Sequence, residues 1–208
     1  MKKINTFWNW FQDNHHTFKN IINETTVNQK HITFWINKSL NYYCRELDFI
    51  IVFPKKVASQ FEFIITANGN KDYFHQVLNL VDKAPQLKTW KFTAFIQLTE
   101  RIDEFIKGLD QPYIFPDITL KASKLIFLTI GYHEISHKLD IVVFLKNYNV
   151  YCDTKTLKQA LFIVMRDIIG EKSPYQNSDF VQLAQAPDIK DGLIKLYDLQ
   201  LYIDGENQ

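Results

Sequence analysis

Residues 61–95 read FEFIITANGNKDYFHQVLNLVDKAPQLKTWKFTAF, and within this stretch the spacing of the apolar residues changes twice. From Phe61 to Thr66 the side chains alternate between two faces, as in a half-buried strand. A set with helical spacing follows and ends before Pro85: Phe74, Val77, Leu78 and Val81. Alternation returns in residues 90–96. The stretch therefore predicts a strand, a helix whose four spaced residues face the sheet, and a second strand. A right-handed crossover between parallel strands is the expected arrangement if the two strands are neighbours or next-neighbours.

The flanking segments extend this pattern in both directions. Upstream, residues 47–53 are rich in β-branched and aromatic side chains and predict an antiparallel hairpin with residues 61–66. The N-terminal third has helical spacing, with Thr26 and Gln29 as a capping box. Downstream, we predict strands over residues 124–132 and 139–146 and a helix over 157–169 that ends at Gly170. These elements indicate the α+β class. We expect a single domain over residues 1–208, with an antiparallel or mixed β-sheet packed with α-helices and a helical N-terminal segment.

Four large aromatic residues lie within five positions near the start of the chain: Phe7, Trp8, Trp10 and Phe11. On a helix, Phe7, Trp10 and Phe11 share a face, and Trp8 lies off it. We therefore predict that these three pack into the core and that Trp8 is the most exposed of the four. Deleting residues 1–13 should then unfold or severely weaken the domain. An exposed Trp8 would be a candidate ligand-binding residue.

The overall composition narrows the functional classes. Of 208 residues, 24 are Lys or Arg and 23 are Asp or Glu, which gives a net charge of +1. This balance creates no long-range field that would attract nucleic acid or an anionic membrane. No segment has the apolar length of a membrane span, and none has the pattern of a signal peptide. Two separated cysteines, Cys44 and Cys152, are typical of a reducing compartment. We therefore expect a cytoplasmic protein that binds neither nucleic acid nor membrane.

Three stretches together carry a resemblance to other proteins. They are FWNWF at residues 7–11, the block at residues 61–95 quoted above, and DIIGE at residues 167–171. Their combination and spacing resemble those of an uncharacterised bacterial protein family, and residues 112–150 match it least well. The resemblance implies a bacterial, intracellular origin and assigns no catalytic residue.

Residues 133–137, His-Glu-Ile-Ser-His, match the H-E-x-x-H pattern of zinc proteases. In those enzymes both histidines lie on one helix face and bind zinc, while the glutamate activates a water molecule. The flanking residues 125–130 and 139–144 read as strands, and the residues between them are polar, as in a hairpin connection. We therefore interpret the stretch as a connection between strands and expect purified protein to contain no stoichiometric zinc.

Two carboxylates near the end of the predicted 157–169 helix form a second candidate site. Asp167 and Glu171 are spaced so that both could reach one face, where paired carboxylates can act as acid and base or hold a cation. The favoured interpretation is a capping and salt-bridge role beside Gly170. The remaining histidines, His15-His16, His31 and His75, are interpreted as helix surface residues.

These observations predict no catalytic residue, no metal and no cofactor. The leading hypothesis is a non-enzymatic binding or protein-interaction module that recognises a protein partner through aromatic surface. Its candidate ligand-binding residues are Asp167, Glu171 and Trp8. The alternative is an enzyme, either a small-molecule hydrolase that uses Asp167 and Glu171 or a zinc hydrolase that uses residues 133–137. A deep polar pocket lined by these side chains would favour the enzyme.

Overall fold

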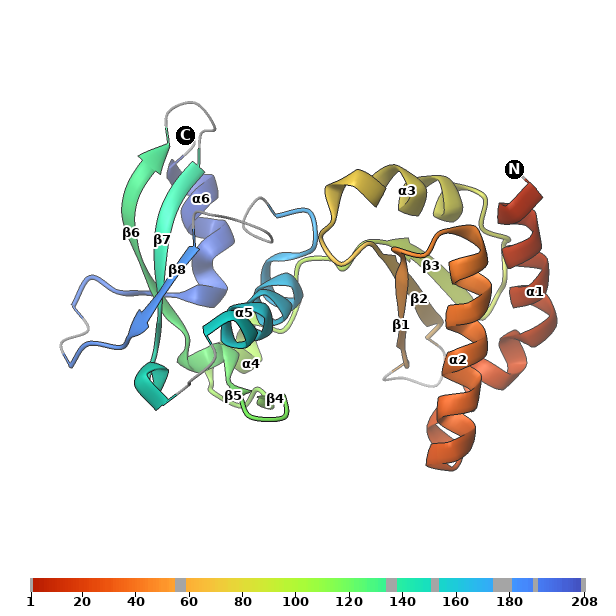
Figure 1. The fold of residues 1–208 in the computed structure, drawn as a ribbon, viewed down its shortest axis with the longest axis horizontal. Coiled ribbons are helices and arrows are strands. Elements are labelled where there is room, and N and C mark those ends of the chain that lie inside the picture. The colour runs from red at the N-terminus through yellow and green to blue at the C-terminus, as the bar shows by residue number, and fades with distance from the viewer. Residues whose placement is uncertain are drawn as a thin grey trace. The chain divides into compact units, whose positions relative to one another are not determined.

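The computed structural model describes residues 2–54, 59–133, 138–150, 154–173, 181–188 and 191–206 (Figure 1). The chain divides into two compact units, Met1–Ile96 and Gln97–Gln208. Each unit has its own cluster of buried apolar side chains and combines helices with a sheet. The predicted α+β class is therefore confirmed. That all 208 residues form one domain stays a prediction.

The first unit joins three helices to a three-stranded sheet. Its elements are α1 (Lys2–Lys19), α2 (Thr26–Tyr43), β1 (Asp48–Val52), β2 (Phe61–Thr66), α3 (Phe74–Asp82) and β3 (Trp90–Ala94). Strand β2 is central: it pairs antiparallel with β1 and parallel with β3 (Figure 1). The predicted hairpin, the parallel pairing and the helical N-terminal segment are confirmed.

Alternation along β2 and β3 separates an aromatic face, which packs against the helices, from a face that mixes polar side chains with Ile64. Phe63 and Phe92 are register partners and belong to the cluster that the three helices share. On the opposite face, the Thr93 hydroxyl donates a hydrogen bond to Glu62, and Lys91 Nζ lies 2.8 Å from the same carboxylate. Because successive side chains of a strand point to opposite faces of the sheet, the aromatic residues at alternate positions all face the helices.

Helix α3 presents a different face to the core from the one that we predicted. Val77 and Leu80 are fully buried, and Phe74 and Val81 pack partly against the cluster. Leu78 is 48% exposed, so the prediction that it faces the sheet is wrong. Successive residues of a helix are rotated by about 100° around its axis. Because Leu80 is buried as well as Val77, the centre of the inner face lies between these two residues. Leu78 then falls beyond its edge.

The helix ends follow the chemistry of the flanking residues. Thr25, one residue before the predicted cap, accepts a hydrogen bond from the Asn28 backbone N–H and starts α2. In the second unit, Gly170 directly follows the helix Thr154–Ile169 and has a φ of 78°. This left-handed conformation suits glycine and ends the helix as predicted.

The second unit is built around a four-stranded mixed sheet in the order β8-β7-β6-β9. Its elements are α4 (Ile102–Ile106), β4 (Tyr113–Ile114), β5 (Thr119–Leu120), the 3-10 turn η3 (Ala122–Lys124), β6 (Ile126–His133), β7 (Lys138–Leu145), α5 (Thr154–Ile169), β8 (Val181–Gln185), β9 (Ile194–Lys195) and α6 (Leu199–Glu206). Strands β6 and β7 are antiparallel, as predicted, whereas β8 adds parallel to β7. Short strands β4 and β5 form a separate hairpin.

The core of this unit lies between one sheet face and helices α5 and α6. Phe127 and Ile141 from the sheet are fully buried, as are Leu161 and Met165 from α5. Ile163 on the same helix is 42% exposed, so α5 also has a face that is open to solvent. No helix in the described ranges is long and apolar enough to cross a membrane.

Candidate functional site

Trp8, the predicted exposed aromatic, is a core residue. It is 3% exposed, and its indole Nε1–H donates a hydrogen bond of 2.8 Å to the Leu80 carbonyl on α3. Its ring packs edge-on against Phe92, with the centroids 4.7 Å apart. The prediction that Trp8 is the most exposed of the four N-terminal aromatics is therefore wrong, and Trp8 offers no free ligand-binding surface.

Trp8 is buried because the inner face of α1 also includes Ile4, which is not part of the aromatic cluster. Ile4 is buried together with Phe7, Trp8 and Phe11, and these four positions have the i, i+3, i+4, i+7 spacing of a helix face. Trp10 lies at the edge of that face and is only partly buried. Because the prediction used only the aromatic residues, it placed the centre of the buried helix face too close to Trp10.

Asp167 takes part in an ion pair and a hydrogen-bond cluster within the second unit. Its Oδ2 lies 2.5 Å from the Arg101 guanidinium and accepts a hydrogen bond from the Tyr113 hydroxyl. Burial, and then the hydrogen bond to Asp167, raise the pKa of Tyr113 above its ordinary value. The cluster links α5 to the segment before α4 and to β4. This geometry supports the salt-bridge interpretation of Asp167.

Glu171 follows Gly170 beyond the end of α5. It is buried, whereas the Asp167 side chain is 38% exposed. The partners that the structure gives to Asp167 are a tyrosine and an arginine. A joint role of Asp167 and Glu171 in hydrolysis stays untested.

Strands β6 and β7 flank the H-E-x-x-H stretch in the chain. Strand β6 ends at His133, β7 begins at Lys138, and these two residues are register partners. Residues 134–137 lie outside the described residues, so the prediction about zinc stays a prediction. Within the described ranges, no group of three or more His, Cys, Asp or Glu side chains is placed to hold a metal ion.

The histidines of the first unit contact neighbouring side chains. His15 Nδ1 accepts a hydrogen bond of 3.2 Å from the Trp90 indole, and burial, followed by the nearby charge of His16, lowers the pKa of His15. On α2, His31 Nε2 accepts a hydrogen bond of 2.8 Å from the Trp35 indole. The first contact joins α1 to β3 and the second lies within α2, so these two histidines do not form a common site.

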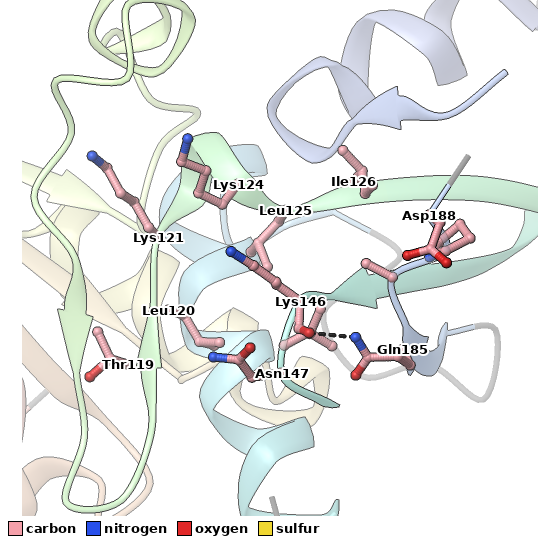
Figure 2. A pocket seen from close by; sticks show the side chains of 13 residues that line it. Thr119, Leu120, Lys121, Lys124, Leu125, Ile126, Lys146, Asn147, Gln185 and Asp188 are labelled. Atoms are coloured by element: carbon pink, nitrogen blue, oxygen red, sulfur yellow. Dashed lines mark hydrogen bonds between the residues drawn. The ribbon is translucent and has the colours of Figure 1, made fainter. Parts of the chain in front are cut away.

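A pocket of about 660 Å³ opens at one end of the sheet of the second unit. Its walls come from β5, η3, the start of β6 and the ends of β7 and β8 (Figure 2). The lining residues are Thr119, Leu120, Lys121, Lys124, Leu125, Ile126, Leu145, Lys146, Asn147, Gln185, Ala186, Pro187 and Asp188. None of the residues singled out from the sequence as site candidates is among them.

Three lysines give the pocket its electrostatic character. In the view of Figure 2, the amino groups of Lys121, Lys124 and Lys146 lie to the left and the Asp188 carboxylate lies to the right. Lys121 Nζ donates a hydrogen bond of 2.7 Å to the Gly108 carbonyl. Lys124 and Lys146 are exposed and form no ion pair with any described residue. Their charges are therefore available to a ligand.

Hydrogen bonds hold the opposite wall in place. The Gln185 amide nitrogen donates to the Lys146 carbonyl, and its amide oxygen accepts from the Asn149 backbone N–H at 3.2 Å. The Ala186 N–H donates to the Leu145 carbonyl at 2.9 Å and prolongs the β7–β8 ladder. Both amide ends of Gln185 are thus used within the protein, and this residue fixes the segment that carries Lys146.

No pattern in the sequence indicates this pocket. Its lysines are separated by other residue types, and the short basic run that the sequence does contain, Lys55-Lys56, lies outside the described residues. Only the fold brings η3 next to the end of β7. No protein-family model, no curated protein and no solved structure matches the chain. Membership of the uncharacterised bacterial family stays a prediction.

Proposed function

We propose that the protein is a binding module that holds a small organic anion in the lysine-lined pocket of its second unit. The observation that carries the proposal is that three lysines from two segments line one pocket: Lys121 and Lys124 flank η3, and Lys146 follows β7. The overall net charge is only +1, so this local excess of positive charge is not a property of the whole surface. A concave wall lined by one sign of charge concentrates ligands of the opposite sign.

The shape and lining of the pocket support an organic ligand. Its volume of about 660 Å³ lies in the range of roughly 300–1,000 Å³ that is usual for small-molecule sites. Leu120, Leu125 and Leu145 line it and are buried. An apolar wall beside ammonium groups suits a ligand with a hydrophobic body and an acidic group. Asp188, across from the amino groups, would accept hydrogen bonds from the ligand.

The lining supports binding more than catalysis. No histidine or cysteine is among the lining residues, and Asp188 is the one carboxylate among them. General acid–base and nucleophilic chemistry usually place such groups within hydrogen-bonding reach of one another. The non-enzymatic binding module predicted from the sequence is therefore retained, with the pocket in place of Trp8 as its site.

Isothermal titration calorimetry with isophthalate tests the proposal, because this dicarboxylate combines an apolar ring with two charges. The neutral isophthalamide has the same shape and is the matched control ligand. We expect saturable binding of isophthalate at low ionic strength and much weaker binding of isophthalamide. The double variant Lys124→Met, Lys146→Met should bind isophthalate about tenfold more weakly, whereas Lys107→Met, an exposed lysine outside the pocket, should bind it normally. No binding to the wild-type protein would refute the proposal.

A second candidate function is favoured by exposed aromatic rings on α2. The α2 aromatic patch consists of Phe34, Trp35 and Lys38; Phe34 is 56% and Trp35 is 42% exposed. Lys38 Nζ lies 4.4 Å from the Trp35 ring centroid, which holds the three side chains together. Exposed Trp and Phe are enriched where proteins bind one another. We infer that this patch binds a protein partner, in agreement with the interaction module predicted from the sequence.

A photo-crosslinking amino acid at position 34 tests the protein-binding role in the cells that produce the protein. The matched control is the same amino acid at position 78, because Leu78 is also an exposed apolar residue of the first unit. We expect one defined covalent adduct from position 34 and none from position 78. The Trp35→Ala variant should lower the yield of that adduct. Equal adducts from both positions would show non-specific contact and refute this role.

The proposed place of action is the cytoplasm of a bacterium. Cys44 is a free, partly buried thiol, which suits a reducing compartment. The balanced charge supports the expectation that nucleic acid is not the ligand.

A further inference from the structure

A buried carboxylate lies behind the lysine side of the pocket. Asp110 follows α4, its side chain is 1% exposed, and it is not among the residues that line the pocket. Its Oδ2 accepts a hydrogen bond of 3.1 Å from the backbone N–H of Ser123, which lies between Lys121 and Lys124. Asp110 therefore anchors the segment from which two of the three pocket lysines extend.

The second oxygen of this carboxylate depends on Lys121. Asp110 Oδ1 is buried and receives no hydrogen bond from any described residue. Among the described residues, Lys121 is the cation within ion-pairing distance, with Nζ at 3.9 Å. A buried charge without compensation is strongly destabilising. If Lys121 turned towards a ligand, Asp110 would lose this partner and Gly108 would lose its hydrogen bond from Lys121.

This arrangement removes one of the three lysines from ligand binding. Lys124 and Lys146 keep exposed amino groups without an anionic partner among the described residues. Charged side chains nearby include Asp188, across the pocket, and Lys195, whose Nζ donates a hydrogen bond of 3.0 Å to the Ser123 carbonyl; Asp198 in turn interacts with Lys195. We infer that Asp110 neutralises Lys121, so that the pocket selects ligands with two negative charges, held by Lys124 and Lys146. The inference rests on the proposed function of the pocket.

A series of ligands that differ in the number of carboxylates on one benzene ring tests the selectivity. Benzoate, isophthalate and benzene-1,3,5-tricarboxylate carry one, two and three carboxylates on the same ring. With the wild-type protein, we expect isophthalate to bind more tightly than benzoate and the third carboxylate to add little. The Asp110→Asn variant keeps an oxygen for the Ser123 N–H but releases Lys121 from its counter-charge. In that variant the tricarboxylate should bind about two- to fivefold more tightly than isophthalate.

A second comparison separates the role of Lys121 from that of the ligand-binding lysines. In the Asp110→Asn background, the further change Lys121→Met removes no counter-charge, so this double variant should fold and should bind isophthalate like the wild type. The single variant Lys124→Met, in which Asp110 still neutralises Lys121, should bind isophthalate about two- to fivefold more weakly. Thermal unfolding of each variant confirms that it is folded.

The outcomes distinguish this inference from the proposed function. If the wild-type protein binds isophthalate but the preference between two and three carboxylates is the same in Asp110→Asn, the inference is overturned and the binding pocket remains. The same holds if Lys121→Met in the Asp110→Asn background weakens isophthalate binding as much as Lys124→Met does in the otherwise wild-type protein. If the wild-type protein does not bind isophthalate at all, both fail.

Discussion

Replacing Trp8 by alanine should strongly destabilise the first unit, and the matched change of Trp35 should not. Trp8 is 3% exposed and Trp35 is 42% exposed, and both rings belong to helices of the same unit. Both indoles donate one hydrogen bond, Trp8 to the Leu80 carbonyl and Trp35 to His31. The two variants thus remove the same chemical groups from a buried and from a partly exposed position.

The magnitude follows from burial. A buried tryptophan hides about 150–250 Å² of surface, and removal of such a ring from a core costs about 3–5 kcal/mol. The lost hydrogen bond adds only about 0.5–1.5 kcal/mol, because the Leu80 carbonyl still accepts the Lys83 backbone N–H. We therefore expect Trp8→Ala to lower the free energy of unfolding by about 4–6 kcal/mol. For Trp35→Ala, partial burial and the loss of the contact with Lys38 should cost about 1 kcal/mol.

Urea denaturation followed by far-ultraviolet circular dichroism measures both values without relying on tryptophan fluorescence. Trp8→Phe is a useful third variant, because it keeps an aromatic ring but removes the indole N–H. It should fall between the wild type and Trp8→Ala. If Trp8→Ala and Trp35→Ala destabilised the protein equally, the assignment of Trp8 to the core would be wrong.

Two further predictions concern helix α3 and the cluster around Asp167. Leu80→Ala should lower the free energy of unfolding by about 2–5 kcal/mol, because Leu80 is fully buried, whereas Leu78→Ala on the exposed side should change it by less than about 1 kcal/mol; urea denaturation of both variants compares them. The raised pKa of Tyr113 means that the folded state keeps a proton that the unfolded state loses above about pH 10, so stability falls as the pH rises through this range. Tyr113→Phe should make that fall shallower in urea denaturation at several pH values, and an unchanged slope would contradict the raised pKa of Tyr113.

Much of the fold could be predicted from the sequence because strands with one buried face have a strict period. In β2, Phe63 and Ile65 had to share a face, and a shift by one residue would have exposed both. The turn residues 67–70 after β2 and Pro85 after α3 mark where the helix of the β2–α3–β3 connection can begin and end, so they limit its length. The α+β class, the β1–β2 hairpin and the parallel pairing of β2 with β3 could therefore be predicted from local patterns.

The inner faces of the helices were harder to predict, and the two errors have one cause. Apolar residues on α1 and α3 cover more than a single face, so the centre of the buried face depends on residues outside the most obvious cluster. Ile4 and Leu80 are those residues, and each rotates the face away from the predicted centre. Trp8 became buried and Leu78 became exposed for this reason.

The candidate site has no local pattern at all, and this reflects how it is built. Lys121 and Lys124 flank η3, whereas Lys146 follows β7, so their approach depends on the pairing of β6 with β7. Lysines at such positions are ordinary surface residues until the tertiary structure brings them together. A carboxylate that lies behind them, Asp110, is equally inconspicuous in the sequence.

Stability and ligand binding should be separable in the second unit because different residues carry them. The core depends on buried apolar side chains such as Phe127 and Leu161, while Lys124 and Lys146 are exposed at the ends of the elements. Replacing these two lysines therefore removes charge without creating a cavity or leaving a buried group unpaired. Asp110 is the exception: it is buried, it holds the turn that carries two of the lysines, and it compensates the charge of one of them. A change at Asp110 should alter both the stability of the unit and the charge that the pocket accepts, and only the conservative change to asparagine separates the two effects.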